Sequence, residues 1–395
     1  MAEPLKNFFD AHLVRRLAAT FLDAAPNFPM ERFVGEAVLG LSDKELLDRG
    51  RHIALALARA LPSQYEEAIG ILMRSLDAPL TRQGGSMSSF FYLPHTVFVA
   101  EYGLSHFELS MQAQHALTQR FTAEFSIRHF LLKDAERTLS TLRNWASDNN
   151  KNVRRLVSEG TRPRLPWAVR LPAFVQDPSP VLSLLEMLKD DPEEYVRRSV
   201  ANSLNDIAKD HPDLAVEVCK RWLRDASPER TAIVRHALRW LVKRGHSGAL
   251  SVMGAGERPR IRLESASVTP AKAGLGDEVL FGVELVSEVK KPQKLMVDYV
   301  VSYPGANGKL RPKVFKLKKL VVEGQKSARL EGRVSLVDLT TRKHHPGEHR
   351  IQLRVNGVDF EVGTFELSHH VPQISGGKSS RKTLSTESPK TKRRR

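Results

Sequence analysis

The feature that most constrains the fold is a helical phrase that recurs in the middle of the chain. A valine followed by two cations appears as Val153-Arg154-Arg155, Val196-Arg197-Arg198 and Val234-Arg235-His236, at spacings of 43 and 38 residues. Such a period is typical of paired-helix repeats of the HEAT kind, which stack and bury a shared core. Carboxylates follow at Glu159 and Asp206 in the first two copies. The repeat predicts a helical solenoid whose long face carries cations and acids together and binds a polyanion.

Apolar periodicity extends the helical interpretation to residues 1–250. Apolar residues recur at three- and four-residue steps from Leu5 to Phe21, which is the pattern of an amphipathic helix. Four further helices are expected at Tyr65–Ser75, Pro94–Tyr102, Phe107–Phe121 and Ile127–Asp134. We therefore predict a HEAT-like helical repeat domain over 1–250.

The residue pattern of the sequence changes after residue 250. Gly254, Gly256 and Pro259 mark a linker over 251–259, and alternating apolar runs follow it. Runs at 279–285, 295–301 and 350–355 favour strands, separated by turn signals rich in glycine and proline. About seven short strands predict an immunoglobulin-like β-sandwich without a disulfide over 260–371. The fold class is thus multi-domain, a HEAT-like α-helical solenoid followed by an immunoglobulin-like β-sandwich, and a disordered basic tail is expected at 372–395.

The charge balance favours an anionic partner. The 395-residue chain has 61 Lys and Arg against 45 Asp and Glu, a formal net charge of +16. Such a field attracts nucleic acid or an acidic membrane surface, although a generically basic soluble protein has the same composition. No apolar run reaches the ~18 residues that a membrane span requires, so no membrane partner is expected.

Cysteine and histidine usage excludes several site classes. Cys219 is the one cysteine and lies in an apolar helical stretch, so we expect a buried, unreactive thiol and a reducing, cytoplasmic location. His344-His345 and His369-His370 are adjacent pairs in or after the β region. Neighbouring strand residues point to opposite faces, so we expect no metal site, and no motif indicates another cofactor.

A helical wheel at about 100° per residue orders the second repeat helix. Its core side is formed by Val196, Val200, Ser203, Leu204 and Ile207. Arg198 and Asn202 lie opposite, and Asp206 is expected on the flank of this polar side. Alignment of the repeats adds Arg155 to the column of Arg198, and Glu159 to that of Asn202. A repeated polar column favours a ligand face over solvated helix faces with intrahelical ion pairs of ~0.2–0.5 kcal/mol each.

Two further residues stand out from their surroundings. Trp167 follows a segment broken by Pro163 and Pro166, so it is either a ligand contact or a packing plug. Glu124 is enclosed by apolar neighbours, so burial would shift its protonation or require a partner. Arg128, four residues later, is the simplest such partner.

Three stretches resemble the AlkC branch of the AlkC/AlkD DNA alkylation repair glycosylases. They are Trp145-Ala146-Ser147-Asp148, the run from Val153 to Trp167, and the run from Tyr195 to Asp206. The resemblance implies a basic concave groove that holds duplex DNA, with the sandwich closing around the far side. It also implies excision of cationic alkylated bases, such as 3-methyladenine and 3-methylcytosine, without drawing the base into a pocket.

The resemblance also implies roles for individual residues. Asp206 corresponds to the principal catalytic carboxylate, Glu159 and Glu124 lie near the lesion, Trp167 contacts the deoxyribose, and Arg155 holds the DNA backbone. Further DNA contacts are expected from the other basic residues of the repeats and their connections. The full set of expected DNA-binding residues is Arg154, Arg155, Arg162, Arg164, Arg198, Arg235, Arg239 and Lys243. The expected partner is duplex DNA with alkylated bases, bound by a monomer.

The chemistry agrees with these roles. Alkylation of a ring nitrogen makes the base cationic and a good leaving group, so the remaining task is to stabilise an oxocarbenium-like sugar with a carboxylate. Indole against the sugar adds cation–π stabilisation. Two alternatives remain open, a non-catalytic HEAT-repeat scaffold for nucleic acid or a protein partner, and an RNA-binding module, because a basic groove does not distinguish DNA from RNA.

Overall fold

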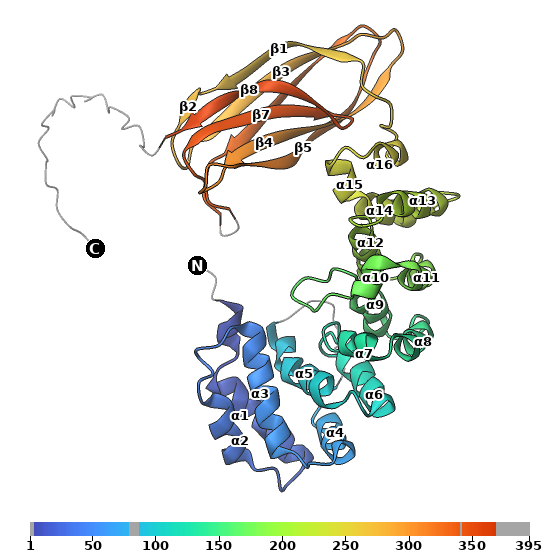
Figure 1. Ribbon diagram of the computed structural model, residues 1–395, viewed down its shortest axis with the longest axis vertical. Coiled ribbons are helices and arrows are strands. Elements are labelled where there is room, and N and C mark those ends of the chain that lie inside the picture. Colours follow the sequence, from blue (N-terminus) through green and yellow to red (C-terminus); the bar gives the residue numbers. More distant parts are fainter. Residues whose placement is uncertain (1–3, 79–86, 340–341, 369–395) are drawn as a thin grey trace, which may run out of the picture. The chain divides into compact units, whose positions relative to one another are not determined.

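The computed structural model of the chain describes residues 4–78, 87–339 and 342–368. The chain divides into two compact units, Met1–Glu257, which is helical, and Arg258–Arg395, which is built from strands (Figure 1). The predicted fold class, a helical solenoid followed by a β-sandwich, is confirmed. The division falls within the expected linker, and the expected basic tail lies outside the described residues.

The helical unit alternates helices with short connections. Its described elements are η1 (Leu5–Phe8), α1 (Ala11–Ala24), α2 (Met30–Val38), α3 (Leu46–Ala60), α4 (Tyr65–Arg74), η2 (Met87–Tyr92), α5 (Leu93–Tyr102), α6 (Phe107–Thr118), α7 (Ile127–Lys133), α8 (Ala135–Trp145), α9 (Lys151–Gly160), α10 (Pro172–Gln176), α11 (Ser179–Leu188), α12 (Glu194–Ile207), α13 (Pro212–Trp222), α14 (Pro228–Ala237), α15 (Arg239–Lys243) and α16 (Ser247–Val252). None of the described helices is long and apolar enough to cross a membrane.

Short polar side chains fix the starts of several helices. Asp10, Asp134, Asn150 and Ser227 accept hydrogen bonds from backbone amides in the first turns of α1, α8, α9 and α14. Each such cap satisfies an amide that the helix itself leaves unpaired and stabilises the helix by about 1 kcal/mol. The cap at Asn150 matters most for function, because it sets where α9 begins.

The helices that carry the recurring phrase, α9, α12 and α14, form one layer of the solenoid. Helix α9 packs against α12, and α12 packs against α14, while α8, α11 and α13 lie beside them in a second layer (Figure 1). Val153, Val196 and Val234 are buried at equivalent positions of the first layer, as the repeat predicts. Because these helices stack in order, the residues that follow each valine lie at equivalent positions in successive repeats.

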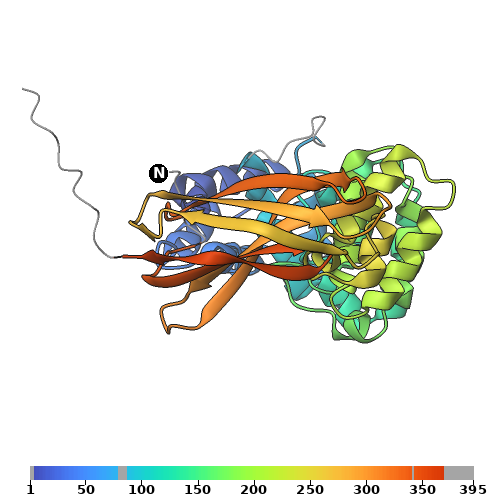
Figure 2. The same ribbon diagram turned by 90° about the horizontal axis from the view of Figure 1, so that it is seen from above.

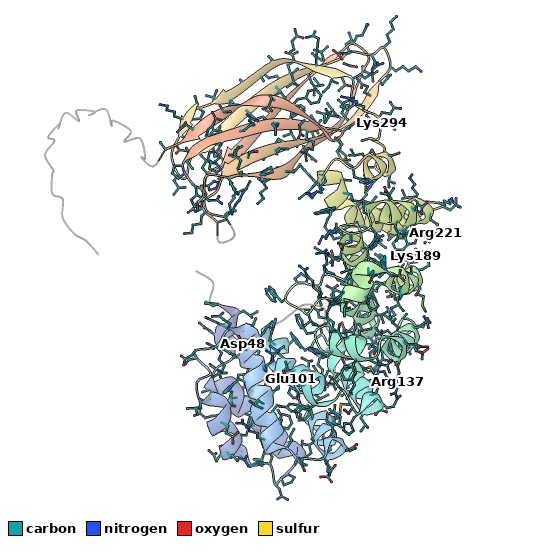
Figure 3. All side chains as sticks on the ribbon, viewed as in Figure 1. Asp48, Glu101, Arg137, Lys189, Arg221 and Lys294 are labelled. Carbon is teal, nitrogen blue, oxygen red and sulfur yellow. The ribbon has the colours of Figure 1, made fainter. Side chains whose placement is uncertain are left out.

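Cations on the second layer are paired with glutamates. Figure 3 labels Arg137 of α8, Arg221 of α13 and Lys189, which follows α11. Arg137 forms an ion pair with Glu108 at 2.7 Å, and both Lys189 and Arg221 contact Glu186. Exposed pairs of this kind contribute ~0–1 kcal/mol each. These labelled cations of the second layer are therefore already matched by acids.

The β unit is a two-layer sandwich, and Figure 2 shows its long strands side by side. Its described strands are β1 (Ile261–Thr269), β2 (Lys272–Ala273), β3 (Glu278–Ser287), β4 (Gln293–Pro304), β5 (Leu310–Val322), β6 (Ser327–Ser335), β7 (Gly347–Val355) and β8 (Val358–Leu367). One sheet has the order β1-β3-β6 and the other β2-β8-β7-β4-β5. Alternate residues such as Val283, Leu285, Ile351 and Leu353 are buried and fill the core between the sheets.

Cys219 and His95 are two titratable side chains that the helical core buries completely. Cys219 is free and buried, and desolvation raises the pKa of its thiol to about 12, as expected of an unreactive thiol. His95 is fully buried beside Phe21 and Tyr92, and neither ring nitrogen has a hydrogen-bond partner among the described residues. Desolvation lowers the pKa of His95 to about 3.

His95 makes the helical unit sensitive to acid. The unfolded chain binds a proton at His95 below pH ~6.5, whereas the folded chain does not until about pH 3. Stability is therefore complete above pH ~6.5 and falls as the pH is lowered, by up to ~1.4 kcal/mol per unit from this group. His95→Leu is expected to flatten the acid side of the pH profile measured by urea unfolding. The exposed His12→Leu serves as control, and an equal slope in all three proteins would contradict the assignment.

Candidate active site

The second cation of the first phrase lies inside the structure rather than on a solvated face. Helix α9 presents Val153, Leu156 and Val157 to the core, and Arg155 and Glu159 on an adjoining face. Both are nearly enclosed, with side-chain exposures of 15% and 7%. The interpretation of this face as solvated is therefore wrong, whereas the intrahelical pair between Arg155 and Glu159 that it included is present.

Six side chains alternate in charge through this region. We call them the charged chain: Glu124, Arg155, Glu159, Arg162, Asp206 and Lys209. They come from the connection before α7, from α9, from the connection after α9, from the end of α12 and from the residues just beyond it. Arg162 and Asp206 are 44 residues apart in the sequence, and Arg164 and Asp210, which form a neighbouring ion pair, are 46 apart. The chain links successive repeats of the first layer.

Glu124 and Arg155 form the first link. Nη1 of Arg155 donates to Oε2 of Glu124 at 2.5 Å and to Oγ1 of Thr122 at 2.9 Å. Burial opposes ionisation of Arg155, but the charges of Glu124 and Glu159 outweigh it and raise the pKa of Arg155. The guanidinium also lies over the ring of Tyr195, 5.2 Å from its centroid. Arg155 is thus fixed by two acids and an aromatic face.

Glu159 is the central acid of the charged chain. Its Oε1 accepts from Arg162 at 2.5 Å and lies 3.6 Å from Arg155, while its Oε2 accepts from Ser199 at 2.6 Å. Burial would raise the pKa of Glu159, but the charges of Arg155 and Arg162 and the Ser199 hydrogen bond lower it below the ordinary carboxyl value. Glu159 is therefore an ionised carboxylate at neutral pH.

Asp206 lies deeper than the helical wheel predicts. Its relative exposure is 1%, so the expected position on the polar flank of α12 is wrong. Its two oxygens accept from Nε of Arg162 and from Nζ of Lys209, both at 2.8 Å. The reason is that α9 and its following connection cover the end of α12 and supply the arginine that makes burial of this carboxylate tolerable.

Trp167 is exposed on the connection between α9 and α10, drawn as a green loop in Figure 1. Its relative exposure is 72% and its φ is +64°, a left-handed conformation that a bulky residue rarely adopts. The alternative interpretation of Trp167 as a packing plug is therefore wrong. A strained and exposed indole is typical of a ligand contact.

A cavity of about 810 Å³ brings most of these residues together. Its lining includes the charged residues Glu124, Arg155, Glu159 and Arg162, with Arg120 and Lys151 as further cations, and it includes Trp167. The apolar and aromatic part of the lining comes from Leu46, Leu47, Phe90, Leu93, Phe121, Phe125, Leu165, Pro166 and Tyr195. Asp206 does not line the cavity. A concave site with an apolar wall and a few convergent charges is the usual form of a binding or catalytic site.

The expected DNA-binding cations divide into two groups. Arg198, Arg235 and Lys243 are exposed on or beside the repeat helices. Arg239 is half-buried and donates to the carbonyl oxygen of His236 at 2.6 Å and to Oδ1 of Asn202 at 3.1 Å. The first three have the exposure that a phosphate contact requires.

The other expected DNA-binding cations are already engaged by acids. Arg154 donates to both oxygens of Asp191, at 2.6 and 3.0 Å, and Arg164 to both oxygens of Asp210. Arg162 is buried within the charged chain. Arg154 also donates to the carbonyl oxygen of Asp148, in the connection that precedes its helix, so it ties α9 to that connection and to Asp191. Its pKa is raised, first of all by the Asp191 hydrogen bond.

Arg128 does not pair with Glu124, which corrects a further expectation. Its guanidinium donates to three backbone carbonyl oxygens, of Gly160 at 2.9 Å, Arg162 at 2.7 Å and Val169 at 2.6 Å. Sequence patterns gave no signal for these carbonyl partners. Tyr195, which lines the cavity, was also missed, although it directly precedes the second valine phrase.

Comparisons with known families match parts of both units of the chain. Residues 118–241 match the family described as DNA alkylation repair enzyme, and residues 262–369 match the C-terminal Ig-like domain of the uncharacterised protein YhaZ. The chain is 36% identical over 366 residues to the uncharacterized protein YhaZ of Bacillus subtilis strain 168, covering 91% of this chain and 99% of that protein. No activity is attached to that relative by its name.

A solved structure extends the match to the whole architecture. The alkylpurine DNA glycosylase AlkC of Pseudomonas fluorescens, bound to DNA containing an abasic site analog, is 36% identical with a TM-score of 0.85. The match covers 93% of this chain and 100% of that protein. The chain therefore belongs to the DNA alkylation repair enzymes, in the branch that contains AlkC.

Proposed function

We propose that the chain is a monofunctional DNA glycosylase of base excision repair. It hydrolyses the N-glycosidic bond of cationic alkylated bases, such as 3-methyladenine and 3-methylcytosine, in duplex DNA. It acts as a monomer on the DNA of the nucleoid in the cytoplasm. The observation that carries the proposal is the cavity that ionised Glu159 lines together with Glu124 and the exposed Trp167.

Hydrolysis of this glycosidic bond requires a negatively charged group near the sugar more than it requires a proton donor for the base. A base that is already cationic departs without protonation, and the sugar left behind gains oxocarbenium character. A preorganised carboxylate stabilises this charge best in a site that excludes water, and indole against the sugar adds cation–π stabilisation. Glu159 and Trp167 supply these two groups, and Glu124 adds a second carboxylate on the same wall.

Asp206 acts together with Glu159 through their shared arginine. Arg162 contacts both carboxylates, so the two acids share this cation. Lys209 also contacts Asp206, and Arg155 also contacts Glu159. In this proposal Asp206 is the decisive carboxylate because it draws the charge of Arg162 away from Glu159.

The exposed cations provide the electrostatic attraction to DNA. Arg198, Arg235 and Lys243 lie on or next to the stacked repeat helices, and lysine or arginine contacts with phosphates supply most of the sequence-independent affinity. Neutral alkylated bases are poor leaving groups without protonation, so the enzyme should excise them much more slowly than cationic ones.

The decisive experiment is incubation of the purified protein with methylated duplex DNA and chromatography of the released bases. Release of 3-methyladenine and 3-methylcytosine well above a protein-free control is the expected result. Binding to the same DNA without any release would instead favour a non-catalytic scaffold. Competition with duplex RNA at a stated salt concentration tests the remaining RNA-binding alternative.

Trp167→Ala is expected to lower excision with little effect on stability. The side chain is mostly exposed, so its loss removes little core packing, whereas a lost cation–π contact in the transition state is worth ~1–2 kcal/mol, or about 5- to 30-fold in rate. Single-turnover excision and thermal unfolding measure the two effects. A normal rate with an unchanged melting temperature would remove Trp167 from the site.

A further inference from the structure

Arg128 has an unusual place for a charged residue. It is fully buried on α7, and its hydrogen-bond partners among the described residues are backbone carbonyl oxygens. Burial is the main cause that lowers the pKa of Arg128, to about 10, with the charge of Arg162 adding to it. The guanidinium thus stays protonated at neutral pH, at an energetic penalty that its hydrogen bonds and the charges of Glu124, Asp206 and Glu159 offset.

The three carbonyl groups belong to one segment. Gly160 ends α9, Arg162 is the arginine shared by the two buried carboxylates, and Val169 lies two residues after Trp167. Nη1 holds the first two and Nε holds the third. Arg128 therefore binds the segment 160–169 on both sides of Trp167.

Little else in the backbone fixes this segment. Pro163 and Pro166 have no amide hydrogen to donate, and the backbone bond from Leu171 to Pro163 is long, at 3.4 Å. Hydrogen bonds from a charged donor are stronger than those between neutral groups, so Arg128 helps to keep Trp167 in its left-handed conformation.

We propose that Arg128 is a positioning residue for base excision. It holds the carbonyl groups on either side of Trp167, and thereby keeps the indole and the Arg162 guanidinium at the cavity wall. The inference rests on the proposed function and deepens it. Arg128 itself does not line the cavity. Its action is through Trp167 and Arg162.

Arg128→Lys tests the proposal, with Arg49→Lys as the matched control. Lysine keeps the positive charge but cannot hold three carbonyl groups in the fixed geometry of a guanidinium. Arg49 is also buried and donates to backbone carbonyls, those of Lys6, Phe9, Ser42 and Lys44, remote in sequence from segment 160–169. Both variants therefore weaken one buried arginine clamp and lose comparable stability.

The two variants should differ in activity. Arg128→Lys is expected to lower the single-turnover excision rate at saturating DNA by about 10- to 100-fold, since small misplacements of site groups have effects of this size. Arg49→Lys should stay within about twofold of the wild type. In the double variant Arg128→Lys/Trp167→Ala the losses should be less than multiplicative, because both changes remove the same positioned indole.

Hydrogen exchange gives a second, activity-independent readout. Amides of 160–171 should exchange faster in Arg128→Lys than in Arg49→Lys. Equal excision rates in the two single variants, fully multiplicative losses in the double variant, or unchanged exchange at 160–171 would each overturn the proposal. If the wild type released no base, the proposed function would fail, and the exchange comparison would still decide whether Arg128 holds the segment.

Discussion

Asp206→Asn is expected to reduce base excision by at least ~3 kcal/mol of transition-state stabilisation, a factor of more than ~100 in rate. The substitution keeps the shape of the side chain and removes its charge. Arg162 is then left with Glu159 as its one acidic partner among the described residues, so it offsets the charge of Glu159 more fully and the cavity wall becomes less negative. Single-turnover excision of 3-methyladenine from duplex DNA measures the effect, and a filter or fluorescence assay checks that binding persists.

Asp191→Asn is the matched control for this prediction. Asp191 is buried like Asp206 and is paired with an arginine of the preceding repeat, Arg154, which contacts Asp191, Asp148 and Asn149 rather than Glu159. Both variants should lose stability, and only Asp206→Asn should lose excision. Glu159→Gln in parallel ranks the two carboxylates. Excision by Asp206→Asn at the wild-type rate would exclude Asp206 from the reaction.

Arg155→Ala is expected to destabilise the helical unit by about 3–5 kcal/mol, because removing one partner of a buried pair leaves the other charge unmatched. Glu124 loses its 2.5 Å partner, and Glu159 keeps only Arg162 and Ser199. The second change Glu124→Gln should restore part of the loss, since it removes the orphaned charge. Urea unfolding of the single and double variants measures this coupling.

The equivalent arginine of the next repeat is a control within the same fold. Arg198 occupies the position of Arg155 in the second phrase but is exposed, so Arg198→Ala should change stability by less than ~0.5 kcal/mol. Equal stability losses for Arg155→Ala and Arg198→Ala would mean that the charged chain does not stabilise the fold.

The helices and strands were largely predictable because their apolar periods are strong. The helices expected at Tyr65–Ser75, Pro94–Tyr102 and Ile127–Asp134 agree with α4, α5 and α7 to within one residue at each end. The run at 295–301 lies inside β4. Strand β5 was harder to see, because its lysines and arginines interrupt the apolar pattern of an edge strand.

The candidate site was only partly predictable, for a physical reason. Glu124, Glu159 and Trp167 were singled out from sequence, and the structure brings all three to one cavity. A wheel describes one helix alone, so it could not reveal that Arg162, 44 residues earlier, enters from another connection and buries Asp206. The partners of Arg128 are backbone atoms, for which no side-chain pattern exists.

The alternation of charge along six residues links DNA affinity to reactivity. A DNA phosphate that attracted the guanidinium of Arg155 would compete directly with Glu124 and Glu159, since all three acceptors share the same donors. Each acid released in this way gains unbalanced charge at the moment when the nucleotide arrives. Binding of the DNA backbone would then activate the two carboxylates. In the free protein their charges would stay balanced by Arg155 until a DNA strand is bound.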